Sequence, residues 1–448
     1  MKTSCSKRLP NRAAILAGKT FSTLDRFIHI EAISGLVLII ATAVALILAN
    51  SRYSEIYQQF WQQPLRVEFI GFSFSKNLHF LVNDVLMTVF FLVAGLEIRR
   101  ELHEGALAQI KQALLPIIAA IGGVCFPAFI YFAFNGYTQT SHGWAVPTAT
   151  DIAFAVGILA LLGRSVPSNL KVILLSLAII DDIIAILIIA LFYSSNFDSF
   201  GLPFVIGAIV LILFLQWIGI DQPWIYVVPG ITLWWGLMIF GVHPSLAGVI
   251  LGLLTPVLPP RAYISPVAHI SNALEVVKND PANNNKLQLY SFALHEIRKG
   301  QNGLLAPASR VQMALAPCVS FIIMPLFALA NAGINFSGYD LSSKSSSAII
   351  LGIGLGLVVG KPIGIVCASF FAIKCGICKL PRDVNWHGLL LVGLLGGIGF
   401  TMAIFTATLA FSNDYQLSTA KFAILCGSLL SAIFGLSFGL WQLYAKKI

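Results

Sequence analysis

Two adjacent carboxylates, Asp181 and Asp182, lie in the middle of the apolar stretch VILLSLAIIDDIIAILIIALFY, where they are the only charged residues. A helix rises about 1.5 Å per residue, so a helical stretch of this length crosses the ~30 Å hydrocarbon core of a bilayer with both carboxylates near the midplane. Each charge costs about 2.5–3.5 kcal/mol at that depth. The pattern therefore predicts that something polar, charged or ionic meets these two side chains.

A lysine and a third carboxylate occur at a similar depth in two other apolar stretches. Lys361 is the only charge in AIILGIGLGLVVGKPIGIVCASFFAI, and Asp151 ends the sequence PTATD, which interrupts a further apolar run. A buried ammonium needs an anionic partner, so we predict an ion pair between Lys361 and one of the adjacent aspartates. Neighbouring helical residues point about 100° apart, so only one of them can face Lys361 squarely. The other can face a hydrated site, and helix geometry does not say which is which.

A carboxylate that faces such a site can hold either a proton or a small hard cation, but not both. Na+ and Li+ are hard cations and prefer oxygen ligands. Asp182, Asp181, Thr150 and the unwound carbonyl groups near Asp151 could supply these oxygens. Competition between H+ and Na+ for one carboxylate, combined with alternating access, is sufficient for antiport. Asp151 would in addition compensate the positive helix N-termini that a break exposes.

The composition is that of a polytopic membrane protein. The chain has 448 residues, of which 57% are hydrophobic and only 10% are charged, whereas a soluble domain has about 25% charged residues. Hydropathy predicts twelve membrane-spanning helices, at roughly 30–50, 82–98, 112–134, 144–162, 172–193, 202–219, 224–241, 243–258, 312–334, 348–373, 386–411 and 417–443. With the N-terminus inside, the inside segments hold 22 of the 28 Lys and Arg residues. The positive-inside rule thus explains the net charge of +9 better than nucleic-acid binding does, and it places both termini in the cytoplasm.

The chain divides into four parts around one membrane-embedded transporter domain. Residues 1–29 carry six Lys or Arg residues and are expected to form a cytoplasmic tail, followed by spans 1–8 over 30–258. Residues 259–311 are expected to form a cytoplasmic linker, followed by spans 9–12 over 312–448. In the outer segment 51–81, polar and apolar residues alternate around Gly71, which predicts a small extracytoplasmic β-hairpin.

The fourth and eleventh spans are poor continuous helices. Pro147 to Asp151 interrupt the fourth span, and Gly393 to Thr401 interrupt the eleventh. Irregular backbone is tolerated in a bilayer only where protein buries it or where it lines a cavity. Each break lies in the middle member of a triplet, spans 3-4-5 and spans 10-11-12. Three spans per copy predict an inverted-topology repeat, and broken helices in corresponding places of the two copies mark the binding site.

Several motifs resemble those of the NhaA family of Na+/H+ antiporters, and the resemblance covers nearly the whole chain. The motifs are TDIAFA at 150–155, AIIDD at 178–182, GKPIG at 360–364, GFTM at 399–402, Asn83-Asp84 with VFFLVAGLEI at 89–98, GVHPSLAG at 241–248 and PLFALANAG at 325–333. The resemblance implies an electrogenic antiporter of the bacterial inner membrane that exports Na+ or Li+ in exchange for H+, for pH and sodium homeostasis. Such a protein is a transporter rather than an enzyme and needs no cofactor. The resemblance also implies a homodimer formed through the hairpin near Gly71.

The resemblance further assigns roles to individual residues. It implies that Asp182 carries the exchanged ion or proton, and that Asp181 is its partner and the counter-ion of Lys361. Thr150 and Asp151 would lie where the two broken helices cross. A surrounding network, linked in part to the pH response, would contain Asp84, Glu97, Glu101 and His243.

One segment departs from the family pattern. Where the family commonly has Leu-Glu-His-x-Leu-His-Pro-Trp-Val, residues 311–319 are VQMALAPCV. Gln312, Met313 and Ala316 thus replace a glutamate and two histidines that titrate on the cytoplasmic side and are linked to pH activation in the family. Because the replacements carry no charge, we predict an altered pH profile.

Three other functions are compatible with intramembrane charges. A cation-coupled symporter of a small organic solute with the same fold is the main alternative, but it needs a larger polar cavity than these spans offer. An ion channel needs a selectivity ring and no proton-linked carboxylate. An intramembrane aspartyl protease needs two aspartates on separate helices, usually with a GxGD sequence, which is absent here. It would also leave Lys361 unexplained.

Overall fold

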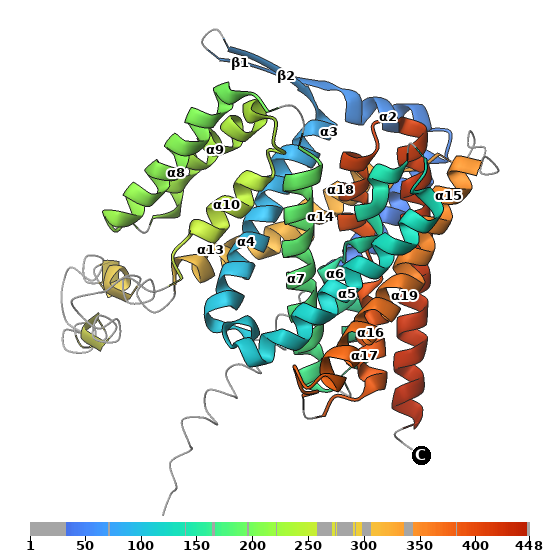
Figure 1. Cartoon of the computed structure of the whole chain (residues 1–448). Coiled ribbons are helices and arrows are strands. Elements are labelled where there is room, and N and C mark those ends of the chain that lie inside the picture. Colours follow the sequence, from blue (N-terminus) through green and yellow to red (C-terminus); the bar gives the residue numbers. More distant parts are fainter. Residues whose placement is uncertain are drawn as a thin grey trace, which may run out of the picture.

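A computed structural model of the chain describes residues 33–445, apart from 70–71, 139, 164–165, 195–196, 221, 258–270, 274, 276–289, 292, 298–305, 336–343 and 382. The predicted tail 1–29 and most of the predicted linker 259–311 lie outside the described residues. The described chain is dominated by helices, with one two-stranded hairpin at the end of the bundle drawn uppermost (Figure 1). The predicted helical class is therefore confirmed.

Most of the helices are long and apolar, and several are joined through π-helical turns. The helices are Ile33–Ala49, α2 (Ser54–Gln62), α3 (Leu78–Phe80), α4 (Met87–Glu104), α5 (Ile110–Asn135), α6 (Ile152–Leu161), α7 (Ser168–Phe192), α8 (Leu202–Trp217), α9 (Val227–Phe240), α10 (Leu246–Leu254), α13 (Pro307–Cys318), α14 (Met324–Asn331), α15 (Lys344–Leu355), α16 (Lys361–Lys374), α17 (Trp386–Gly396), α18 (Phe400–Ala410) and α19 (Asp414–Ala445). The π-helical turns are η1 (Leu81–Leu86), η7 (Val319–Ile323) and η8 (Gly356–Gly360). They connect α3 to α4, α13 to α14, and α15 to α16.

The described residues contain nine helices that are long and apolar enough to cross a membrane, or up to eleven if each of two bent pairs is one span. The first pair, Ile33–Ala49 with α2, bends by 113°, and the second, α17 with α18, bends by 47°. The predicted span at 243–258 contains α10, which has only nine residues. The protein is thus a multi-pass membrane protein, whereas twelve full spans remain a prediction.

The predicted hairpin is present. Strand β1 (Pro64–Phe69) pairs antiparallel with β2 (Phe72–Asn77), and Phe69 lies opposite Phe72. Gly71 itself lies outside the described residues. The hairpin lies at the same end of the bundle as α2 and α3 (Figure 1), and we call this end the hairpin side.

Close helix packing positions Lys361, which is buried in the core. Helix α5 packs against α16, and a Cβ atom on Gly122 would lie only 2.3 Å from the carbonyl oxygen of Gly364. The two backbones therefore touch where no side chain intervenes, because small residues allow membrane helices to approach closely. Lys361 begins α16 one turn before Gly364 and is fully buried. The contact between the two helices thus places its ammonium inside the bundle.

Two interruptions in the helices meet next to this lysine. A 3₁₀ helix, η3 (Ser141–Thr148), ends before the non-helical residues Ala149 to Asp151, after which α6 begins. The second interruption separates α17 from α18. The backbone N–H of Asp151 donates a hydrogen bond of 2.7 Å to the carbonyl oxygen of Ile398. This bond ties the two interruptions together in the core, and we call the region the helix junction.

Candidate functional site

The predicted ion pair of Lys361 is present, and its partner is Asp181. The Lys361 Nζ atom lies 3.0 Å from Asp181 Oδ2, and both side chains are fully buried. The ammonium also donates to the Thr148 carbonyl oxygen at 2.5 Å and to the Thr150 hydroxyl. An ammonium has three N–H donors, so these three acceptors satisfy it completely. The contact answers the question that helix geometry left open, because α7 directs Asp181 toward Lys361.

Thr150 connects this ion pair to the second helix interruption. Its hydroxyl oxygen lies 2.7 Å from Asp181 Oδ2 and 3.0 Å from the Gly396 carbonyl oxygen. A hydroxyl has one proton, so it donates to only one of these acceptors at a time while it accepts from Lys361. The structure thus places Thr150 within the ion-pair cluster. Asp181 Oδ1 is buried and has no hydrogen-bond partner in the part of the chain that the structure describes.

Asp151 accepts hydrogen bonds from backbone N–H groups at the N-terminal ends of two helices. Its Oδ1 atom accepts the N–H of Phe154 at 3.1 Å and thereby caps α6. Its Oδ2 atom accepts the N–H of Thr401 at 3.1 Å, near the start of α18, and also the Thr401 hydroxyl. A carboxylate is favourable at the positive end of a helix, as predicted for this residue. Thr401 lies in the GFTM motif, but the sequence did not identify its contact with Asp151.

Asp182 differs from both other aspartates. It is only 6% exposed, yet it has no hydrogen bond or ion pair with any described residue. It borders a cavity of about 80 Å³. The cavity is lined by Phe90, Val93, Ala94, Glu97, Thr150, Asp151, Ile152, Ala153, Asp182, Gln312, Ala316, Val319, Ser320, Met324 and Met402.

Two helical faces form the walls of this cavity. One wall is α4, whose lining residues Phe90, Val93, Ala94 and Glu97 recur at helical spacing. The other runs from α13 through η7 to α14, with lining residues from Gln312 to Met324 at similar intervals. Both walls are mainly apolar. A carboxylate that has no partner and borders a small, mainly apolar cavity can take up a proton or a small cation there.

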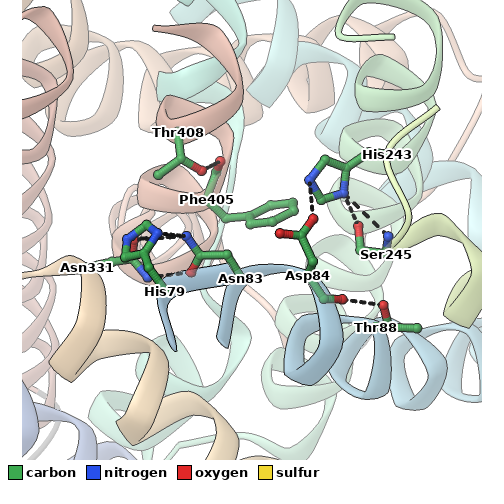
Figure 2. Close-up of polar contacts among 9 residues, drawn as sticks. All are labelled: His79, Asn83, Asp84, Thr88, His243, Ser245, Asn331, Phe405 and Thr408. Carbon is green, nitrogen blue, oxygen red and sulfur yellow. Dashed lines mark hydrogen bonds and ion pairs between the residues drawn. The ribbon is translucent and has the colours of Figure 1, made fainter. Parts of the chain in front are cut away.

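A second polar group lies on the hairpin side of the junction (Figure 2). Asp84 Oδ1 lies 3.5 Å from His243 Nε2, and His243 Nδ1 lies 2.7 Å from the Ser245 hydroxyl. Asn331 donates to the side-chain carbonyl oxygen of Asn83 at 2.7 Å. We call these five residues, together with His79, the hairpin-side cluster.

The members of this cluster contact one another. Asn83 Nδ2 lies 3.2 Å from His79 Nδ1. The ring of Phe405, which is 1% exposed, lies between the histidine–aspartate pair and the two asparagines (Figure 2). The sequence pointed to Asn83, Asp84 and His243 but gave no signal for the contacts of His79.

The predicted network residues fall in three separate places. Asp84 and His243 pair on the hairpin side, and Glu97 lines the cavity. Glu101 lies 3.7 Å from Arg100 and accepts the N–H of Ala106 at the end of α4. Asp84 and Glu97 are thirteen residues apart on one continuous helical run, which corresponds to about 20 Å along its axis. This separation explains why they share no contact.

Comparison with known proteins gives extensive matches. A family model described as Na+/H+ antiporter 1 matches residues 25–438. The Na(+)/H(+) antiporter NhaA of Bartonella henselae is 56% identical over 449 aligned residues, which cover 100% of this chain and 98% of the relative. The protein of the same name from Janthinobacterium sp. is 53% identical and covers 99% of this chain and 98% of its own length.

Among solved structures, the sodium proton antiporter MjNhaP1 from Methanocaldococcus jannaschii is similar over 94% of this chain and 98% of its own. Its sequence identity is 12% and the TM-score is 0.46. A likeness this distant adds nothing to the matches at the level of sequence.

Proposed function

The chain belongs to the Na+/H+ antiporter 1 family, and from this premise we propose that it exchanges Na+ or Li+ for protons across the bacterial inner membrane. The single observation that carries the proposal is the contrast between the two adjacent aspartates. Asp181 is held by Lys361 and Thr150, whereas Asp182 has no hydrogen bond or ion pair within the described chain and borders a cavity.

Asp182 is the carrier in this proposal. A buried carboxylate without a partner is costly, and either a proton or a bound cation removes that cost. The two occupants exclude each other because both need the same oxygens. The protein then needs no cofactor, since Na+, Li+ and H+ are its cargo, and it acts as a transporter rather than an enzyme.

Asp181 and Lys361 hold the junction next to the carrier. Their ion pair joins α7 to α16, and Thr150 extends it to the end of α17. We infer that this cluster senses the occupancy of Asp182, because a charge change on one aspartate alters the field at its neighbour. Asp182 and the ion pair also provide two separate places where protons can be held, which supports electrogenic exchange with more protons than sodium ions per cycle.

The membrane arrangement follows from the same proposal. The bond between Asp151 and Ile398 supports two broken spans that cross at the midplane within an inverted repeat of twelve spans. The excess of Lys and Arg on one side supports cytoplasmic termini and an outward-facing hairpin. Strands β1 and β2 pair only with each other among the described residues, and the edges that remain could join two protomers into a homodimer.

The size of the cavity supports an inorganic ion over the alternative, an organic solute. Pockets for small organic ligands usually measure about 300–1,000 Å³, whereas the cavity at Asp182 measures about 80 Å³. It has room for a cation and a few waters. Its walls also offer few side chains that could orient an organic molecule, since most of the lining residues are apolar.

Inverted membrane vesicles test the proposal. A proton gradient is established by respiration, and salts of Na+, Li+ or K+ are then added while a pH-sensitive dye reports the gradient. We expect Na+ and Li+ to dissipate the gradient in vesicles with the native chain but not with Asp182→Asn. Glu55→Gln, which neutralises an exposed carboxylate on α2, is the matched control and should behave like the native chain. No response of the native chain to either ion would refute the proposal.

A further inference from the structure

Gln312 is a polar residue that takes no part in the hydrogen bonds or the ion pair of the helix junction. It lies on α13 and is only 4% exposed. Its side-chain amide makes no hydrogen bond with any described residue, and it lines the cavity that contains Asp182. A buried amide without a partner is unfavourable unless water or an ion satisfies it. The Gln312 amide is therefore available to a water or an ion in the cavity.

A second group without a partner lines the same cavity from the facing helix. Glu97 Oε1 is buried and has no hydrogen-bond partner among the described residues. The two helices that carry these side chains, α4 and α13, pack against each other. The lining residues include Glu97, Asp151 and Asp182 but no Lys, Arg or His. Asp151 is already compensated by helix N–H groups, so the cavity attracts a cation at Glu97 as well as at Asp182.

Both groups lie far from the hairpin side. Gln312 precedes Asn331 by nineteen residues on one helical run, which corresponds to about 28 Å along the axis. Glu97 follows Asp84 by thirteen residues, or about 20 Å. Gln312, Ala316 and Ser320 recur at intervals of four residues along one wall of the cavity that Asp182 also borders.

We propose that the Gln312 amide oxygen and the Glu97 carboxylate form a first station for a monovalent cation, from which the ion passes to Asp182. The inference rests on the proposed function, which it deepens by naming how the ion is captured. Gln312 is then a specificity-determining residue for capture, whereas Asp182 holds the ion during exchange.

The amide at position 312 sets the strength of this station. A glutamine supplies an oxygen ligand without a second negative charge, so the station contains one carboxylate. A stopping point on an ion path must bind well enough to admit the ion and weakly enough to release it. A second carboxylate would hold the cation more tightly and would also compete for protons. The neutral residue thus favours release toward Asp182.

The test compares variants at position 312 by their dependence on ion concentration. Gln312→Leu keeps the approximate size of the side chain and removes the oxygen. We expect the apparent KM for Na+ and Li+ in inverted vesicles to rise about fivefold, the size expected for one lost polar contact, while the maximal rate stays unchanged. Gln312→Glu restores an oxygen, so its KM at alkaline pH should not exceed the native value. Met313→Leu alters the next residue, which is 55% exposed, and serves as the matched control.

A double variant tests whether the two groups act together. Glu97→Gln should also raise the KM, and the effect of Gln312→Leu should be smaller in the Glu97→Gln background, because the effects of two groups that bind the same ion are not additive. If Gln312→Leu does not fold, Gln312→Ala in the same comparison takes its place. An unchanged KM in the position-312 variants, or a loss of maximal rate alone, overturns the inference. Absence of Na+ and Li+ exchange by the native chain and by Met313→Leu would instead overturn the proposed function itself.

Discussion

The two sides of the helix junction contain similar polar residue types, but among the described residues the side chains have partners on one side and none on the other. On the hairpin side, Asp84 pairs with His243 and Asn331 pairs with Asn83 (Figure 2). On the other side, the carboxylates of Asp182 and Glu97 and the amide of Gln312 line a cavity, and the described chain offers no partner to Asp182, to Gln312 or to Glu97 Oε1. The two sides therefore differ in the hydrogen-bond and ion-pair partners of their polar side chains, and not in residue type.

This difference separates side chains that hold helices together from side chains that we propose bind a cation. Hydrogen-bonded polar groups fix the packing of the helices that carry them. Phe405 packs tightly among these helices, since its ring centroid lies 5.3 Å from that of Phe91 and 5.4 Å from that of His243. On one side of the junction the polar side chains are thus paired, whereas on the other side Asp182, Glu97 and Gln312 border a cavity.

The sharpest test of the comparison neutralises one carboxylate on each side. Asp182→Asn should lower exchange by about 100-fold or more, because an amide has no acidic proton that it can give up when the cation binds. Asp84→Asn should lower it by no more than about threefold, the size of one altered polar contact. Vesicle exchange at equal protein levels measures both. Equal losses in the two variants would contradict the distinction between the sides.

The next effect concerns stability at the junction. Lys361→Ala leaves Asp181 buried without its partner, which costs about 3–5 kcal/mol. We expect the melting temperature of the detergent-purified protein to fall by several degrees. Lys379→Ala, which removes an exposed lysine, should leave it unchanged. A Lys361→Ala protein as stable as the native one would mean that the ion pair does not hold the junction.

A smaller effect is expected on the hairpin side. Asn331→Leu leaves the buried Asn83 amide without its main partner, at a cost of about 1–3 kcal/mol. Adding Asn83→Leu should recover part of this loss, because two apolar residues replace two polar ones. Thermal unfolding measures the stability, and vesicle assays should show exchange within a factor of about three of the native chain. Loss of exchange without loss of stability would instead assign ion binding to this side.

The smallest expected effect is on the pH profile. The triple variant Gln312→Glu, Met313→His, Ala316→His adds groups that gain protons as pH falls. The cavity then becomes less negative at acidic pH and attracts cations less well. Exchange by the variant should therefore decline more steeply below the reference histidine pKa of about 6.5, by roughly twofold to threefold relative to the native chain. If the exchange activities of the variant and the native chain follow the same pH profile both above and below that pKa, the predicted influence of this segment is contradicted.

Local patterns in the sequence made part of the fold and of the site predictable. The hairpin followed from alternation within a few residues, and the pairing of Lys361 with an aspartate followed from the cost of a lone charge in an apolar helix. The capping of helix starts by Asp151 followed from the break beside it. Each of these inferences needs only a short segment or a single buried charge.

Other features depend on how distant helices pack, and the sequence alone did not reveal them. Glu97 and Gln312 line one cavity although they are more than two hundred residues apart. Hydropathy placed a full span at 243–258, but α10 ends after nine residues. The choice of Asp181 as the partner of Lys361 also came from the family resemblance, since helix geometry allowed either aspartate.

Asp182 is the group that we propose exchanges a proton for a cation at the junction. The most direct measurement is proton release from the purified protein in weakly buffered detergent when NaCl is added, with choline chloride as the control for salt. The native chain and Asp84→Asn should release protons on addition of Na+, and Asp182→Asn should release none. Release from Asp182→Asn equal to that of the native chain would show that another group carries the exchanged proton.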